Sequence, residues 1–499
     1  MFRPLRAATF SPSTAAVCIG SGRFVRAMLV PVLRAVGADV VVAQTRGRDF
    51  ADACARASGA YEMDVFRADG STETEVVEVE AVGSLGDVEG RAAFMELPAQ
   101  LPGLKYIGFA VTDSGIVKDG QAVVDLAEFV LEATWAGKPA DSAPFERYLE
   151  AKVHFHNTMV DRLTNHRPGN PLVPSTEPRP RKALVIEDLH AVLDAAAFAA
   201  QPGVHIRSRR AELAEDRLLK LCVANAVSSA MVQLMALARV NTTVHCYRDP
   251  VVRAYMDLLF ETDIVPAVAV RGVSRAAAQQ TYDEWMARFH HGHAGLDTFW
   301  VAQNTMFKYD VRLFCSIAAS ASSDPAYRPS ALMVFAAAVI LRYLTPVEPR
   351  PRRVLAPRGE PVFVGAMDPV AAYSYNTAKV SWVYGDSMTA DLSSGEYEFT
   401  DDAGGYIARH LGAASNAWLG AAAGSDAQRS AGLRVGVAVT AALSTLRDFD
   451  LSKDVFVAFA ADVADVYVKL LDVRTSASGS SLDVLKDVMH ALQSRSATQ

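Results

Sequence analysis

Short apolar runs alternate with one helical stretch at the start of the chain. Residues 15–20 (AAVCIG) and 38–43 (ADVVVA) predict buried strands, and residues 23–36 between them show the apolar spacing of a helix. A strand, a glycine turn, a helix and a second strand within about thirty residues are typical of a βαβ unit. Further strand-like runs lie at 74–82, 105–111 and 152–159. The first third of the chain therefore predicts an α/β sheet domain.

From about residue 208 the pattern changes to long helical stretches rich in Ala, Leu and Val. These stretches cover residues 210–239, 250–260, 272–290, 325–344, 405–423, 430–447 and 453–472. Two proline-rich segments, 165–182 and 345–361, predict irregular connectors. We therefore expect a sheet domain over residues 1–205 and a mostly helical domain over residues 206–499, which the Pro/Arg-rich break at 345–361 divides.

Composition and charge narrow the class of protein. The 499 residues are 51% hydrophobic and 21% charged, which is typical of a folded chain. The formal net charge is −7 and the basic residues are scattered, so we expect no nucleic-acid partner. No apolar segment near the start is long enough for a signal peptide, and we expect a cytoplasmic protein.

Cysteines and histidines give little support for a metal or a disulfide framework. The five cysteines are widely spaced and include no CxxC pair. His290, His291 and His293 cluster without further ligands at metal spacing, so no metal site is expected. Segment 218–238 has the length of a membrane span, but its polar residues favour a buried helix and no membrane partner.

The glycine turn after the first strand suits a dinucleotide. Gly20 and Gly22 let the backbone approach a pyrophosphate, and the following helix offers free N–H groups. Val25 stands where the usual fingerprint has its third glycine, and a simple tight turn is the alternative. After the second strand, Arg46 suits the 2′-phosphate of NADP and Asp49 suits the ribose hydroxyls of NAD. The pattern slightly favours NAD, with NADP as the alternative.

One polar side of the apolar helix at 210–239 carries candidate chemistry. At about 100° per residue, Arg217, Asn225 and Ser228 share a side with Lys220. Burial and a neighbouring arginine lower the pKa of a lysine, and a lysine near neutrality takes a proton from an alcohol. An asparagine amide donates to the alkoxide that develops. This combination suits hydride transfer to a nicotinamide, whereas a lysine that merely extends to the surface is the alternative.

A set of short motifs runs in order through residues 15–320. They are GSGRFVR at 20–26, TDSGI at 112–116, HNTMVDRLT at 156–164, TEP at 176–178, VIED at 185–188, KLCVAN at 220–225, RF at 288–289, DT at 297–298 and Lys308-x-x-x-Arg312. Together they resemble the mannitol dehydrogenase family, the long-chain polyol dehydrogenases and hexuronate reductases. The resemblance implies a Rossmann-type N-terminal domain and a helical C-terminal domain. It also implies NAD(P)-dependent interconversion of a sugar alcohol, polyol phosphate or hexonate with its ketose.

The resemblance also implies roles for individual residues. Lys220 matches the catalytic lysine, and Asn157 and Asn225 match the two asparagines that stabilise the alkoxide. Phe24 and Arg26 belong to the cofactor turn. Asp188 and Lys308 match positions that contact the substrate.

Three positions depart from the family pattern. Ser228 replaces a histidine, Arg217 replaces a glutamate and Trp300 stands where an arginine is expected. Serine still hydrogen-bonds a substrate hydroxyl, but it does not replace the chemistry of imidazole. These departures motivate the alternative of a catalytically degenerate relative that binds nucleotide or sugar without turnover. Under either hypothesis we expect a small-molecule polyol or ketose as the partner, and a monomer or small homo-oligomer.

Overall fold

The fold is described from a computed structural model of the chain. The structure describes residues 14–67, 69–109, 129, 143–237, 243, 249–289, 301–302, 305–345, 381–384, 388–391, 396–399, 403–475 and 481–496. Two compact units divide the chain, Met1–Asp216 and Arg217–Gln499. We refer to them as the sheet unit and the helical unit. The division lies inside a helix, eleven residues beyond the boundary expected at residue 205.

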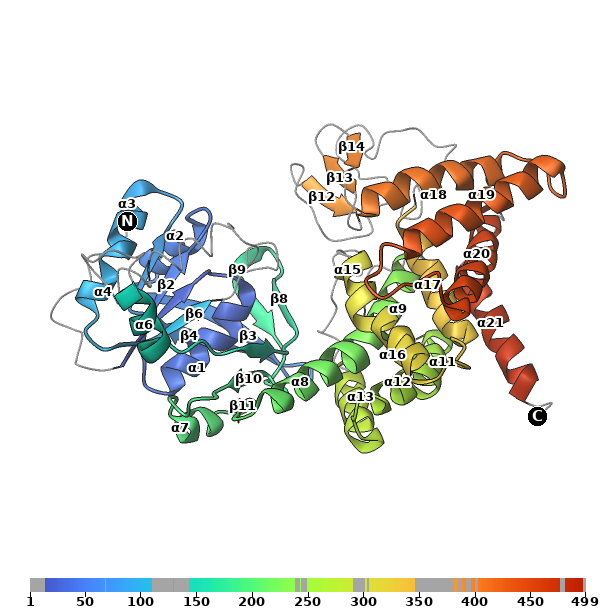
Figure 1. The fold of residues 1–499 in the computed structure, drawn as a ribbon. Helices are drawn as coiled ribbons and strands as arrows, with labels where there is room; N and C mark the ends of the chain where they lie inside the picture. Colours follow the sequence, from blue (N-terminus) through green and yellow to red (C-terminus); the bar gives the residue numbers. More distant parts are fainter. Residues whose placement is uncertain are drawn as a thin grey trace. The chain divides into compact units, whose positions relative to one another are not determined.

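A four-stranded parallel sheet is the centre of the sheet unit (Figure 1). Its order is β5-β2-β1-β6, with every neighbouring pair parallel. The strands are β1 (Ala15–Ile19), β2 (Asp39–Gln44), β5 (Ala81–Ser84) and β6 (Leu104–Phe109). Strands β2 and β6 lie on opposite sides of β1, so the strand order reverses at β1, which is the topological switch point of the sheet. In such sheets the ligand lies beyond the carboxyl ends of the strands at this point.

Both faces of this sheet are buried, which explains its continuous apolar strands. Successive side chains of a strand point to opposite faces. Ala16 and Cys18 of β1 therefore pack with Met28 of the first helical segment, whereas Val17 packs with Phe94 on the other face. The covering segments are η1 (Val25–Leu29, a π-helix), α1 (Val30–Ala35), α2 (Asp49–Arg56), α3 (Val88–Met95) and α4 (Leu97–Gln100). The predicted βαβ unit is confirmed.

Two smaller sheets complete the sheet unit. One has the order β4-β3-β9-β8 and the other β11-β10-β7. Their strands are β3 (Ala60–Phe66), β4 (Thr72–Glu78), β7 (Thr158–Val160), β8 (Thr164–Arg167), β9 (Asn170–Thr176), β10 (Leu184–Glu187) and β11 (Val204–Arg207). Helices α6 (Ala143–Lys152) and α7 (Ala195–Ala199) lie between them in sequence.

Three predictions about strands in this region were wrong. The run at 74–82 is split between β4 and β5, which belong to different sheets. In the run at 152–159, Lys152 is the last residue of α6, residues 153–157 belong to no helix or strand, and pairing begins only at Thr158. The proline-rich segment 165–182 contains β9, because its prolines occupy positions that need not donate a ladder hydrogen bond.

The helical unit has one extensive apolar core. Its helices include α8 (Arg210–Leu219, which spans the division), α9 (Asn225–Leu237), α11 (Pro250–Leu259), α12 (Val265–Ala269), α13 (Arg275–Phe289), α15 (Thr305–Tyr309), α16 (Cys315–Ser323), α17 (Ala331–Tyr343), α18 (Ala403–Leu419), α19 (Asp426–Leu443), α20 (Asp454–Thr475) and α21 (Ser481–Ser496). α17 is apolar on all sides and packs against α9 and α20 (Figure 1). A helix of this composition is stable only when it is surrounded.

Three π-helical segments join helices of this unit end to end. They are η3 (Lys220–Ala224), η4 (Phe260–Ile264) and η5 (Asp310–Phe314). The run Arg210–Met235 is long and apolar enough to cross a membrane, but 72% of its apolar window is buried inside the protein. It is therefore typical of a core helix.

A short antiparallel sheet, β12-β13-β14, lies between α17 and α18 in sequence. Its strands are β12 (Ser381–Tyr384), β13 (Met388–Asp391) and β14 (Glu396–Phe399). No strand was predicted here. Apart from residue 345, the predicted break at 345–361 lies outside the described residues.

Candidate functional site

The glycine turn follows β1 directly. Gly20 has a φ of +102°, which side-chain-bearing residues rarely adopt, and its N–H donates to the carbonyl of Ala43 at 2.8 Å. Gly22 accepts the first helical hydrogen bond, from the N–H of Arg26 at 3.1 Å. A Cβ added at Gly22 would meet no atom within 4 Å, so the backbone borders open space. Phe24 is 50% exposed beside it. This geometry fits the pyrophosphate of a dinucleotide.

Arg26 has a different place from that of a ligand contact. Its side chain is buried and donates to the carbonyl oxygens of Ser21, at 2.8 Å, and Leu172. The guanidinium also lies 4.9 Å from the ring centre of Phe50. Burial lowers the pKa of Arg26. The structure therefore assigns this residue to holding the glycine turn in shape from behind.

Arg162, in the NTMVDR motif between β7 and β8, also holds the segment after the glycine turn through backbone carbonyl groups. It is buried and donates to the carbonyl oxygens of Glu177, at 2.9 Å, and Ala27. Burial lowers its pKa to about 10. The two buried arginines therefore tie the helix after the glycine turn to the β8–β9 region.

The segment after β2 presents the two residues expected to select the cofactor. Arg46 and Asp49 are both exposed, and Asp49 begins α2. The buried side chain of Gln44 shapes this segment, because its amide donates to the carbonyl of Arg46 at 2.8 Å and accepts from the N–H of Ala51 at 3.0 Å. Both candidate residues therefore border solvent beyond the carboxyl end of β2.

Asn157 lies just before β7, inside the run 152–159 that was expected to form a strand. Its side chain is exposed, and its amide nitrogen donates to a carboxylate oxygen of Glu187 at 2.8 Å. The backbone N–H of Glu187 donates in turn to the carbonyl of Asn157 at 2.9 Å. An asparagine amide has two N–H donors, so Glu187 orients the group and leaves a second donor for a ligand. Sequence reasoning missed Glu187, although it stands at the end of the buried strand β10.

Asp188 follows Glu187 and is buried. Its carboxylate accepts from the backbone N–H groups of Val192, at 3.2 Å, and Leu193, at 2.9 Å. Burial opposes its ionisation, but these hydrogen bonds outweigh burial and hold the pKa of Asp188 below its ordinary value. The Nδ1 atom of His156 lies 3.9 Å from a carboxylate oxygen of Asp188. In this structure Asp188 shapes the loop after β10.

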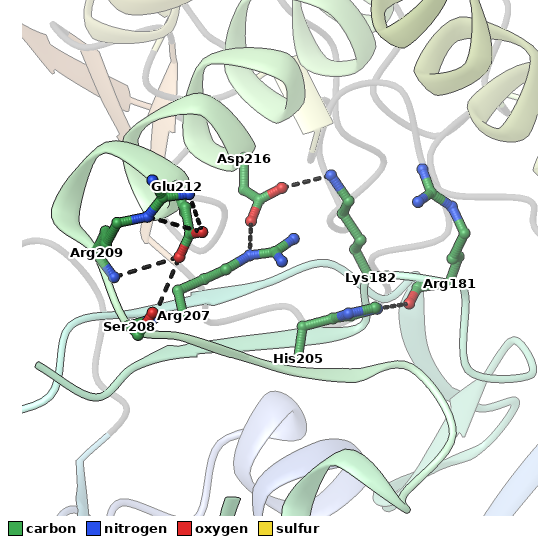
Figure 2. Close-up of polar contacts among 8 residues, drawn as sticks. All are labelled: Arg181, Lys182, His205, Arg207, Ser208, Arg209, Glu212 and Asp216. Atoms are coloured by element: carbon green, nitrogen blue, oxygen red, sulfur yellow. Dashed lines mark hydrogen bonds and ion pairs between the residues drawn. The ribbon is translucent and has the colours of Figure 1, made fainter. Parts of the chain in front are cut away.

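A buried carboxylate in the second turn of α8, Asp216, fixes this helix to the sheet unit (Figure 2). It accepts from Arg207 at 2.7 Å and from Lys182. Burial opposes ionisation of Asp216, but these two cations hold its pKa below the ordinary value. In the first turn of α8, Glu212 accepts from the backbone N–H of Arg209. Lys220 follows Asp216 by one helical turn.

Lys220 begins the π-helical segment η3, and Asn225 follows this segment as the first residue of α9. The N–H of Asn225 donates to the carbonyl of Lys220, a hydrogen bond that spans five residues. Counting about 100° per residue had set the two side chains about 140° apart. A π-helix has more residues per turn, so Asn225 lies about one turn beyond Lys220 and closer to the helix face of Lys220 than in an α-helix. Both residues are half-buried.

Ser228 and Lys308 complete the predicted substrate set. Ser228 is half-buried in α9, and the adjacent Ser229 accepts from Arg312 at 2.9 Å. Lys308 is half-buried in α15 and donates to the carbonyl of Val301 at 2.7 Å. The expectation that Asn157 acts together with Lys220 joins residues of two separately described units and stays a prediction.

Some predicted features lie outside the described residues. They are TDSGI at 112–116, the histidines at 290, 291 and 293, and Trp300. Among the residues that are described, no group of three or more His, Cys, Asp or Glu side chains could hold a metal ion.

Comparison with known proteins gives a fold. No protein-family model and no curated sequence matches the chain. In structure it is similar to a D-sorbitol dehydrogenase in substrate-free form, with a TM-score of 0.59, 14% identity and 94% of each chain covered. It is also similar to Pseudomonas fluorescens mannitol 2-dehydrogenase in a ternary complex with NAD and D-mannitol. Here the TM-score is 0.64, the identity 15% and the coverage 96% of each chain.

The chain therefore shares its fold with these two dehydrogenases, as its motifs predicted. A Rossmann-type N-terminal part and a mainly helical C-terminal part are confirmed.

Proposed function

We propose that the protein is an NAD(P)-dependent dehydrogenase that interconverts the secondary alcohol of a sugar alcohol with its ketose. The observation that carries the proposal is the η3 turn, which presents Lys220 and Asn225 one turn apart on a half-buried helix. The fold shared with two polyol dehydrogenases supports it, and so does the open glycine turn at Gly22.

Each residue has a defined part in the proposed reaction. Bound NAD supplies the acceptor for the hydride. Lys220 takes the proton of the substrate hydroxyl, while Asn157 and Asn225 donate to the oxygen as negative charge develops. Glu187 orients the amide of Asn157.

The glycine turn and the segment after β2 supply the proposed cofactor contacts. Gly20 and Gly22 hold the pyrophosphate, and Arg46 and Asp49 border the ribose. We propose NAD as the cofactor, with NADP as the alternative that Arg46 favours. Ser228, Asp188 and Lys308 are the proposed substrate residues. Asp188 would act chiefly by shaping its loop.

The test follows absorbance at 340 nm with NADH or NADPH and a panel of ketoses, ketose phosphates and keto-hexonates. We expect turnover with one of these classes. In Lys220→Ala, kcat/KM falls by about 10²–10⁴ while NADH binding is unchanged. Lys469→Ala, at an exposed lysine of α20, is the matched control and keeps full turnover. In Lys220→Ala, added primary alkylamines restore part of the lost rate, because they supply the base that the variant lacks.

Two outcomes would contradict the proposal. Normal turnover in Lys220→Ala would remove the lysine base. NADH binding without turnover across the whole panel would favour the degenerate relative, which the serine at position 228 also motivates.

A further inference from the structure

Two thiols meet beside the η3 turn, and the proposed dehydrogenase reaction uses neither of them. The sulfur atoms of Cys222, in η3, and Cys315, at the start of α16, lie 3.1 Å apart. The two cysteines are separated by 93 residues in sequence. They meet because η3 and η5 pack against each other.

The surroundings of the pair are polar and charged. Arg271 donates to the sulfur of Cys222 at 3.4 Å. The sulfur of Cys315 lies 3.3 Å from the carbonyl oxygen of Val311, and the sulfur of Cys222 lies 3.8 Å from the same oxygen. Cys222 is only 3% exposed, whereas Cys315 is half-buried and Arg271 is exposed. A small oxidant would therefore approach the buried sulfur of Cys222 from the side of Cys315 and Arg271.

Hydrogen bonding prepares Cys222 as the nucleophile. The bond from Cys315 is the main cause that lowers the pKa of Cys222, burial opposes it, and Arg271 adds to the lowering. The same bond and burial raise the pKa of Cys315. A thiolate, and not a thiol, attacks an oxidant. By contrast, burial raises the pKa of both Cys18 and Cys54 to about 12.

We propose that Cys222 and Cys315 are a peroxide-sensitive dithiol that closes to a disulfide in the folded protein. A disulfide bond is about 2.05 Å long, so the sulfur atoms need to approach by only about 1 Å. This proposal does not rest on the proposed dehydrogenase activity.

The chemistry has two steps. The Cys222 thiolate attacks one oxygen of hydrogen peroxide, and the O–O bond breaks. Cys222 becomes a sulfenic acid, and the other peroxide oxygen leaves as hydroxide. The sulfur of Cys315 then attacks the sulfur of Cys222 and its S–O bond breaks. The hydroxyl leaves as water with the proton of Cys315. The hydroxide takes up the proton that Cys222 had released, so two thiols are oxidised and one peroxide becomes two waters.

The experiment treats the folded full chain with hydrogen peroxide, blocks remaining thiols with N-ethylmaleimide and digests the protein without reduction. A Cys246→Ser background removes the one cysteine outside the described residues. We expect a cross-linked Cys222–Cys315 peptide pair in the mass spectrum, reversed by dithiothreitol. Cys18 and Cys54 serve as internal controls and stay reduced. The oxidised form melts at least ~5 °C higher, because the bond closes a long loop.

Two variants test the two steps separately, so the test does not depend on the correct folding of any single variant. In Cys315→Ser the disulfide is lost, and dimedone traps a sulfenic acid at Cys222. Arg271→Gln, at an exposed position, slows disulfide formation at least ~3-fold with the melting temperature unchanged. The proposal is overturned if both thiols stay free while peroxide oxidises other residues, or if Cys222 pairs with a cysteine other than Cys315.

Discussion

Replacing Asp216 by asparagine removes the charge that holds Lys182 and Arg207 against α8 (Figure 2). Hydrogen bonds to charged groups contribute about 1.5–3 kcal/mol each, and breaking a buried pair costs about 3–5 kcal/mol. The side chains of Lys182 and Arg207 keep 22% and 25% of their surface exposed, so water recovers part of the loss. We expect Asp216→Asn to cost about 2 kcal/mol.

Hydrogen exchange of the amides in α8 measures this cost locally. A loss of about 2 kcal/mol raises the exchange rate about 30-fold, since about 1.4 kcal/mol corresponds to a factor of ten. Glu212→Gln is the matched control on the same helix. Its carboxylate is partly exposed and we expect little change.

The pH dependence has a definite sign. The pKa of Asp216 is lower in the folded than in the unfolded chain, so its ionised form stabilises the fold. The stabilisation is complete above about pH 4, the unfolded value, and is lost as the pH falls through the folded pKa. The difference between wild type and Asp216→Asn should therefore be constant from pH 7 to about pH 5 and shrink in acid. Equal exchange rates for the two proteins at pH 7 would refute this reasoning.

Three further predictions concern the glycine turn and the thiol pair. Gly22→Ala should weaken NADH binding at least ~10-fold with an unchanged melting temperature, because the added Cβ would occupy only the open space beside the turn. Gly20→Ala should instead destabilise the fold by about 1–2 kcal/mol, since the φ of Gly20 is +102°. Arg26→Met should cost about 3 kcal/mol in urea unfolding because it leaves two carbonyl groups without their donor, and an unchanged midpoint would contradict its buried role. Alkylation of native Cys222 should reach half its maximal rate below about pH 8.5, the ordinary thiol value. Cys315→Ala, which removes the hydrogen-bond donor, should move that midpoint upward.

The fold could be predicted from the sequence because its signals are local. The apolar strands at 15–20 and 38–43 and the long helical stretches each carry their own periodicity. The proline-rich strand β9 could not, because its partners β3 and β8 supply the pairing that its composition does not announce.

The sequence proposes the residues of the candidate site but does not predict their contacts. The angle assigned between Lys220 and Asn225 assumed an α-helix, and nothing in KLCVAN marks the π turn. The partners of the predicted residues are also tertiary: Glu187 orients Asn157 from another strand, and Leu172 accepts from Arg26. Such contacts link positions far apart in sequence, so periodicity alone does not reveal them.

The division of the chain inside α8 has a consequence for biosynthesis. The sheet unit leaves the ribosome first, and the remainder takes on the order of tens of seconds to follow. By then Lys182 and Arg207, which precede α8, are already available to Asp216. Nucleation is the costly step of helix formation, whereas extension is favourable. The turn that carries Lys220 can therefore grow from a helix already begun and anchored, without a second nucleation in the nascent helical unit.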